Sequence, residues 1–311
     1  MKATSLIYLV IILVSFKLTA GAQQQLATNT DTTFKPKIGS FDVGYSYSPF
    51  TVNHKKMSIQ QTNASLSVPI VNNFKDGKLD FLMAGVSYSG LTLSGTGQTF
   101  GGTEFYSISV PITFQKSFSQ KYALLVSAIP TLSSDLKDVS GDDISYSAFA
   151  MLKIRTSKTF SYAIGAGYSR QFFGSILLPV IGIDWQISDK LSLSGTLPVS
   201  EKLKYQLSDK SIIGLSSDFG IGGGSYRLSK KTGSNYLQVQ QYKNTLFYNY
   251  QLAKNFSVQI SGGYNFVQKL DLYNKDQKVN WAPFNDLNKR VPLAELKKTG
   301  ITVESGISYR F

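Results

Sequence analysis

Apolar residues alternate with small or polar residues through most of this chain, and this period of two limits what the chain can fold into. Residues 160–168 carry Phe, Tyr, Ile, Ala and Tyr on one face and Ser, Ala and Gly on the other. Segments 106–114 and 256–265 repeat the pattern. Because successive side chains of a β-strand point to opposite faces, the pattern predicts strands. No helical stripe competes with it, so we expect an all-β protein.

The positions of the aromatic residues separate two kinds of β protein. In each of these segments an aromatic residue stands at both ends of the apolar face, as Phe160 and Tyr168 do. A tilted strand of this length spans roughly 20 Å vertically, which matches a lipid-facing band between two aromatic girdles. A soluble sandwich would place its aromatic residues in mid-strand. The sequence therefore predicts a transmembrane antiparallel up-and-down β-barrel.

The first residues have the features of a secretory signal. Met1 and Lys2 precede the apolar stretch 6–16, and small residues at 20–22 suit a signal peptidase. The alternative is a membrane anchor helix, but Lys17 interrupts the apolar run too early for a span. We therefore expect three regions, which are a removed signal peptide (1–22), a polar N-terminal segment (23–37) and the barrel (38–311).

The composition excludes several classes of protein. The chain has no Cys and one His, so we expect no disulfide, no lipoprotein anchor, no metal site and no cofactor. A mean hydropathy of -0.06, with no long apolar run after the signal, excludes a helical membrane protein. The net charge is +13. For an exported chain this balance favours lipopolysaccharide or acidic small solutes as partners over nucleic acid.

The C-terminus carries a second pattern. Residues 301–309 alternate between apolar and polar, and the chain stops on Phe311. This resembles the terminal β-signal of bacterial outer-membrane proteins, and the whole mature chain resembles uncharacterised Gram-negative outer-membrane β-barrel families. The resemblance implies that Tyr309 and Phe311 form an assembly signal for the barrel assembly machinery. It also implies a barrel in the outer membrane lipid.

Polar turns predict the number of strands. The short turns fall near 72–78, 116–121, 155–158, 185–190, 205–210 and 250–255. Longer links fall near 49–56, 94–103, 133–143, 172–175, 199–202, 229–234 and 270–299. Short periplasmic turns that alternate with longer outer loops predict fourteen strands with both termini in the periplasm. The two strands in 191–207 would be unusually short, so twelve strands is the alternative.

Alternation also predicts which side chains face the lumen. Eight charged residues have inward parity, namely Asp42, Lys153, Arg155, Asp184, Asp218, Lys243, Glu304 and Arg310. They are expected to form either a charged constriction that screens solutes or ion pairs that hold the wall. Large apolar residues are predicted inward at Phe81, Met83, Leu125, Phe149 and Met151. That wall would suit hydrophobic solutes, or it would partly fill the barrel.

The segment 270–299 departs furthest from the strand pattern. It is locally cationic, and helical turns are expected within 291–298. The predicted gate residues are Trp281, Phe284, Lys289 and Arg290. We expect the segment to fold over or into the barrel mouth, with Trp281 and Phe284 packed near Phe149 and its basic residues favouring anions. A mobile surface loop is the alternative.

These patterns favour a passive pore or solute channel of unspecified cargo. A plugged barrel that docks partner proteins is the first alternative. A lipid hydrolase or acyltransferase at the rim, using His54, is the second. No spacing selects a catalytic partner for His54, so we expect no enzyme.

Overall fold

The computed structural model describes residues 38–311, except 53, 96–98, 220–223 and 283–288. The predicted signal peptide and polar segment therefore lie outside the described residues. Strands make up the fold: β1 (Ser40–Val52), β2 (Lys55–Lys75), β3 (Lys78–Ser94), β4 (Glu104–Ser109), β5 (Ile112–Ser117), β6 (Tyr122–Ser134), β7 (Ile144–Arg155), β8 (Phe160–Gln171), β9 (Gly174–Gln186), β10 (Leu191–Leu197), β11 (Ser200–Ser208), β12 (Ser211–Phe219), β13 (Gly224–Arg227), β14 (Tyr236–Ala253), β15 (Phe256–Tyr273), β16 (Val279–Ala282) and β17 (Ala294–Arg310). Two short 3₁₀ helices, η1 (Gly141–Asp143) and η2 (Lys230–Thr232), lie in connections. No helix of the described residues is long and apolar enough to cross a membrane.

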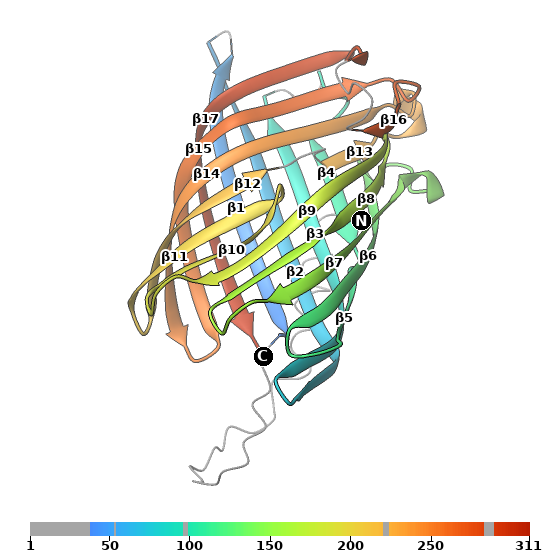
Figure 1. The fold of residues 1–311 in the computed structure, drawn as a ribbon. Helices are drawn as coiled ribbons and strands as arrows, with labels where there is room; N and C mark the ends of the chain where they lie inside the picture. Colours follow the sequence, from blue (N-terminus) through green and yellow to red (C-terminus); the bar gives the residue numbers. More distant parts are fainter. Residues whose placement is uncertain (1–37, 53, 96–98, 220–223, 283–288) are drawn as a thin grey trace, which may run out of the picture. The chain divides into compact units, whose positions relative to one another are not determined.

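The strands form a closed antiparallel barrel of 14 strands with two extra strands, β13 and β16 (Figure 1). Beta4 and β5 together count as one barrel strand. The ends of the chain close the barrel, because β1 pairs with β17 from Ser40 and Arg310 onward. We call this the terminal end, and the opposite end the loop end. The predicted fold and the count of fourteen are confirmed.

The segment 106–114 was predicted as one strand, and the structure divides it into β4 and β5. Pro111 stands at the break and has no N–H to donate to a neighbour. Its carbonyl still accepts a hydrogen bond from the Gly85 amide at 2.9 Å. The barrel wall is therefore continuous across the break, although the prediction of a single strand was wrong.

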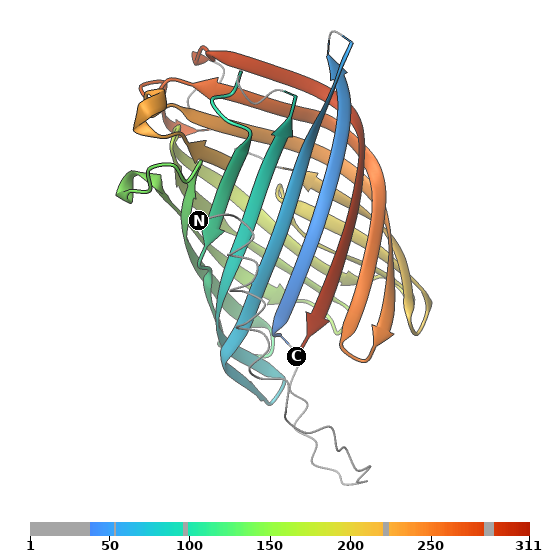
Figure 2. The ribbon, with the colours of Figure 1, turned by 180° about the vertical axis from the view of Figure 1, so that it is seen from behind.

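The short strands in 191–207 are real strands of the barrel. Beta10 has 7 residues and β11 has 9, and the two pair with each other as a hairpin. The alternative of twelve strands is therefore wrong. Beta10 pairs with β9 only through Ile181–Gln186 of β9. The wall is low at this hairpin and high on the other side, where β1, β2, β3 and β17 are long (Figure 2).

The outer face of the wall is apolar at mid-height. Ile164, Ile260 and Val303 are 52%, 62% and 51% exposed, and all three point outward. Aromatic residues flank this band, with Tyr264 and Phe266 toward the loop end. Leaving so many large apolar side chains exposed is unfavourable in water and favourable in hydrocarbon, so the band defines a transmembrane barrel.

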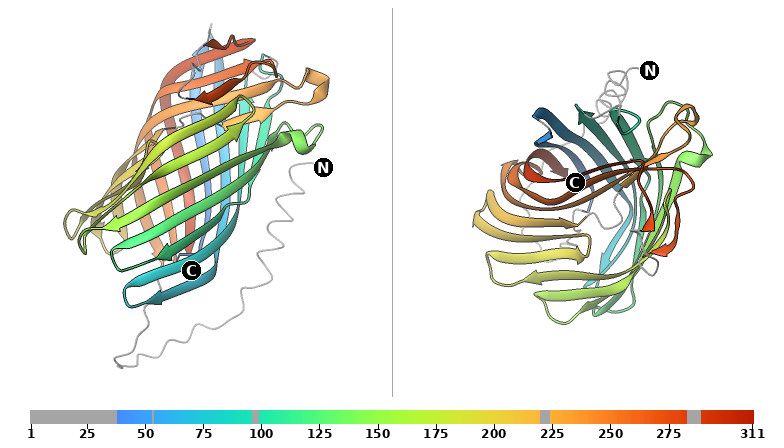
Figure 3. Two further views of the ribbon diagram at one scale, coloured as in Figure 1. Left: turned by 45° about the vertical axis from the view of Figure 1, so that its right-hand side comes forward. Right: turned by 90° about the horizontal axis from the view of Figure 1, so that it is seen from above.

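Three long strands bend over the loop end instead of continuing the wall. Residues 236–239 of β14 and 270–273 of β15 are all buried, whereas a barrel wall buries only alternate residues. Figure 3 shows β14, β15 and β17 leaning across the loop end toward the opposite strands. We call these segments, residues 236–241, 267–273 and 294–299, the roof.

A candidate chamber beneath a closed roof

The underside of the roof is an apolar core. Leu237 and Leu270 are fully buried, and they pack in one cluster with Leu91 of β3 and Phe105 of β4. The other members of the cluster are Ile59, Leu93, Phe100, Tyr226, Leu228, Val239 and Leu272. The two walls therefore meet across the lumen at the loop end, and the side chains fill the space between them.

Beta13 ties the roof to the strand opposite. It pairs with β14 on one side, and with β6 through the single pair Arg227 and Ser134 on the other. The Ser133 hydroxyl donates to the Ser225 carbonyl at 2.7 Å. Tyr226 lies between these contacts, and burial raises the pKa of its hydroxyl to about 12. Beta13 therefore spans the loop end between β14 and β6, and we call it the crossbar.

Arg227 is the centre of a buried polar network on this crossbar. Its guanidinium donates to the Asp143 carboxylate, which is fully buried. It also donates to the Ser140 hydroxyl at 3.1 Å and to the Asp138 carbonyl at 3.2 Å. Ser140 caps η1 and so holds Asp143 in position. Each buried charge has an opposite partner, which keeps the network stable away from water.

A second anchor lies above the roof, where β16 pairs in parallel with β9. Arg290 stacks on Tyr273 at 4.2 Å and on Phe173 at 5.2 Å. Its guanidinium donates to the Tyr236 hydroxyl at 2.9 Å and to the Gln238 side chain at 2.7 Å. The connection between β15 and β17 is therefore fixed to β9 through β16, and to the turn before β9 through Arg290.

The segment 270–299 consequently differs from its prediction. Strand β15 extends to Tyr273 and β17 begins at Ala294, so the connection is shorter than predicted. The helical turns expected within 291–298 were wrong, because Ala294–Lys298 belongs to a strand. In this segment half-buried residues, such as Leu296 and Lys298, alternate with exposed residues. This period of two is the overlooked strand signal.

The four gate candidates lie in different environments. Arg290 is buried, and Lys289 is exposed. Trp281 belongs to β16, and Phe284 lies outside the described residues. The described part of the connection packs on Phe173, in the turn between β8 and β9.

A polar layer separates the roof from the space below it. The Asn265 amide donates to the Ser48 hydroxyl at 3.2 Å, and Ser48 donates to Thr302 at 3.0 Å. Lys243 and Glu304 form an ion pair immediately below. These side chains satisfy one another, so the apolar core ends at this layer.

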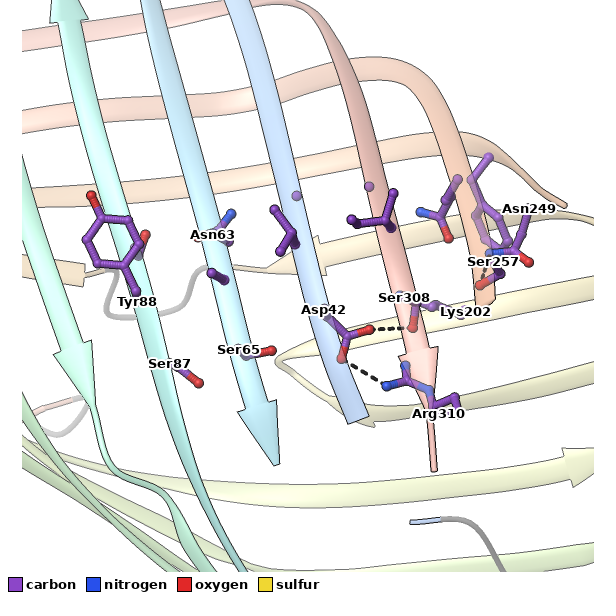
Figure 4. Close-up of a pocket in the computed structure, with 18 of the residues that line it drawn as sticks. Asp42, Asn63, Ser65, Ser87, Tyr88, Lys202, Asn249, Ser257, Ser308 and Arg310 are labelled. Carbon is purple, nitrogen blue, oxygen red and sulfur yellow. Dashed lines mark hydrogen bonds and ion pairs between the residues drawn. The ribbon is translucent and has the colours of Figure 1, made fainter. Parts of the chain in front are cut away.

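Below this layer the barrel is hollow. A chamber of about 630 Å³ lies between the walls, and it reaches Arg310 at the terminal end (Figure 4). Apolar residues such as Ile212 and Phe247 form part of its lining. The polar and charged lining residues are Asp42, Asn63, Ser65, Ser87, Tyr88, Ser89, Ser107, Ser109, Lys202, Lys204, Asn249, Ser257, Gln259, Ser308 and Arg310. Small-molecule sites have volumes in this range.

The structure brings six of the eight predicted lumen charges together as pairs. Arg310 donates to Asp42 at 2.9 Å, Lys153 lies 3.8 Å from Asp184, and Lys243 contacts Glu304. The Asp218 carboxylate accepts a hydrogen bond from Ser216 at 3.3 Å. Arg155 is exposed near the terminal end of β7.

Sequence reasoning missed two sets of inward residues. Lys202 and Lys204 line the chamber, but their parity was not assigned because β11 was uncertain as a strand. Leu91 and Leu93 share a face with Ser87 and Ser89. The change from serine to leucine along that face was an available signal for the roof.

His54 and the chain end complete the set of predicted residues. His54 is exposed in the turn between β1 and β2, with a φ of 65°. The rings of Tyr309 and Phe311 stack at 6.0 Å. Phe311 and Gly39 exchange two backbone hydrogen bonds of 3.1 Å. The last residue therefore takes part in closing the barrel.

These features define the class, a 14-stranded transmembrane β-barrel with a chamber at one end and a filled core at the other. The family follows from the sequence: the chain belongs to the family of the domain of unknown function DUF6268, whose model matches residues 44–309. No curated protein matches the chain.

Several solved structures are similar at low identity. An outer membrane channel from Pseudomonas putida F1 is 10% identical with a TM-score of 0.40, over 91% of this chain and all of that one. The toluene transporter TodX of Pseudomonas putida is 10% identical with a TM-score of 0.39, over 88% and 89%. The outer membrane protease OmpT of Escherichia coli is 9% identical with a TM-score of 0.25, over 92% and 100%. These likenesses are too distant to assign a cargo or an activity.

Proposed function

We propose that this protein is an outer-membrane solute channel whose loop end is closed by its own strands in the resting state. The observation that carries the proposal is the chamber of about 630 Å³ beneath the roof. A barrel that served only as a scaffold would gain stability by filling this space with side chains. Instead hydroxyl, amide and charged groups share its lining with apolar residues such as Ile212 and Phe247, and these polar groups interact well with water and solutes.

The strand pairings that join the roof region to the opposite strands are few. Beta13 joins β6 through one residue pair, and β16 joins β9 through two. The barrel strands themselves pair along most of their length, as β14 and β15 do from Tyr236 to Ala253 of β14. The roof can therefore lift while the wall stays closed, which is the behaviour expected of a gate.

The outer surface supports the location. The apolar band with its aromatic borders fits lipid, and the terminal aromatic residues fit an assembly signal. The proposed orientation puts the terminal end in the periplasm and the loop end outside. In this arrangement the barrel contacts outer-membrane lipid and lipopolysaccharide, and the barrel assembly machinery inserts it.

A plugged barrel that docks partner proteins is the second candidate. The observation in its favour is the apolar core of the roof, in which Leu237, Leu270 and Phe105 are fully buried. A rim enzyme has less support, since His54 sits in an exposed tight turn. We propose no enzymatic activity.

The channel proposal is tested by measuring conductance while a reversible covalent cross-link holds the roof closed. Gln171→Cys with Ser225→Cys places two thiols where a side-chain hydrogen bond of 2.8 Å joins β8 to β13. The natural chain has no Cys, so a short thiol cross-linker that reductant cleaves can bridge only these two positions within the chain. In planar bilayers we expect openings in the natural protein, loss of openings after cross-linking of the double variant, and recovery with reductant.

The matched control locks two neighbouring wall strands instead. Ser147→Cys with Ser169→Cys joins β7 to β8, whose hydroxyls lie 2.7 Å apart. Cross-linking of this variant should leave the openings unchanged. A folded natural protein that shows no openings, and gains none when Arg227 is replaced by Ala to loosen the roof, would support the plugged barrel and refute the channel.

A further inference from the structure

The chamber has a cationic side. Lys202 and Lys204 point inward from β11, and Arg310 lies at the end of β17. Asp42 is the one carboxylate among the described residues that line the chamber, and Arg310 and Ser308 both donate to it. Three cations therefore stand against one carboxylate, and Figure 4 labels Lys202, Asp42 and Arg310 among the residues that line the chamber.

The two lysines differ from the other inward charges. Lys153, Lys243 and Arg310 each have a carboxylate partner. Lys202 and Lys204 form no ion pair with a described residue. Their strand neighbours on β10 are the uncharged Ser194 and Ser192. These ammonium groups are therefore available to an anion that enters the chamber.

The opposite side of the chamber is a surface of hydroxyls and amides. Ser65, Ser87 and Ser109 are neighbours across β2, β3 and β4, so they form one row. Asn63, Ser89 and Ser107 form a second row next to the first. All six line the chamber. Such groups donate to and accept from the hydroxyls of a polyol in several orientations.

We propose that the chamber binds an anionic solute with several hydroxyl groups, of the sugar-acid class. The carboxylate lies against Lys202 and Lys204, and the hydroxyls lie against the serine rows. Only this combination uses both sides of the chamber: acetate lacks the hydroxyls and a neutral sugar lacks the charge. The inference rests on the proposed channel for the passage of the solute, whereas binding requires only the chamber.

Calorimetric titration of the full-length protein in detergent with three probes tests the assignment. D-Glucuronate carries the charge and the hydroxyls, D-glucose carries the hydroxyls alone, and acetate carries the charge alone. We expect D-glucuronate to bind at least tenfold more tightly than either of the others, since charge-assisted hydrogen bonds are lost with D-glucose. Equal affinity for D-glucuronate and D-glucose, or no binding of any probe, would overturn the proposal.

Matched variants identify the site. Lys202→Gln with Lys204→Gln should weaken D-glucuronate binding about tenfold, and the two Arg substitutions at these positions should restore it. Lys190→Gln with Lys210→Gln changes the net charge equally in the exposed turns beside β10 and β12, and it should leave binding unchanged. Equal weakening by both pairs would mean that the general field of the protein attracts the anion, and would refute the site.

Binding and conductance can fail separately. D-Glucuronate binding without openings would refute the channel and keep the site. Openings that are indifferent to Lys202 and Lys204 and to D-glucuronate would keep the channel and refute the site.

Discussion

The two halves of this barrel share the same pattern of strand pairing, but one has a filled apolar interior and the other a hollow, partly polar one. At the loop end the inward residues are large and apolar, such as Leu91 and Leu270, and the walls meet in a core. Around the chamber the inward residues include small polar ones, such as Ser87 and Ser109, and the space stays open. The inward face of β3 contributes Ser87 and Ser89 to the chamber, and Leu91 and Leu93 to the core. The size of the inward side chain therefore decides between filling and hollowing, while the strand pairing stays the same.

The largest expected effect comes from the terminal end, because both halves depend on closure there. Deletion of 309–311 removes the hydrogen bonds between Gly39 and Phe311 and the last pairs of β17 with β1. We expect loss of barrel insertion with normal export, measured as loss of the heat-modifiable band in membranes. Insertion at the natural level would contradict the assembly role of Tyr309 and Phe311.

A change in the crossbar network should be the next largest. Arg227→Ala leaves the buried Asp143 carboxylate without its partner, which costs about 4 kcal/mol in the free energy of opening of the roof. Hydrogen exchange should accelerate in β13 and residues 236–239, and stay slow in β7 and β8. Uniform acceleration across the barrel would show that the roof does not open on its own.

Shortening a buried leucine should have a somewhat smaller effect. Leu270→Ala creates a cavity in the roof core, where Leu270 is 0% exposed, and should destabilise the roof by about 3 kcal/mol. Its counterpart in the chamber, Ser109→Ala, should stay within about 0.5 kcal/mol. Protease cleavage at the loop end, compared between the two variants, measures the difference. Similar cleavage in both would remove the energetic distinction between roof and chamber.

The smallest expected effect concerns the chamber ion pair. The side chains of Arg310 and Asp42 are 52% and 36% exposed, so solvent screens their attraction. Asp42→Asn should therefore change stability by about 0.5 kcal/mol, and less at high salt. Urea unfolding monitored by gel mobility at two salt concentrations checks this value. A loss comparable to that of Arg227→Ala would show that the pair is shielded from water.

The sequence predicted the barrel because alternation is a local property of each strand. Inward parity predicted Asp42 and Arg310 for the lumen, and both line the chamber, where the register brings them together across β1 and β17. The roof could not be predicted in the same way, since residues 236–239 are buried on both faces by strands far away in the chain. Lys202 was missed for another reason. Residues 191–207 could form either two short strands or an irregular loop, and the inward or outward direction of a side chain can be assigned only in a strand.

The short hairpin of β10 and β11 has a consequence for the surrounding lipid. A strand of 7 residues is about 23 Å long before it is tilted, whereas the lipid-facing band of such barrels is about 25 Å tall after tilting. Beta2, with 21 residues, exceeds that height easily. We therefore expect the bilayer to be thinner beside β10 and β11 than beside β2. Lipids with short acyl chains should be enriched next to this hairpin.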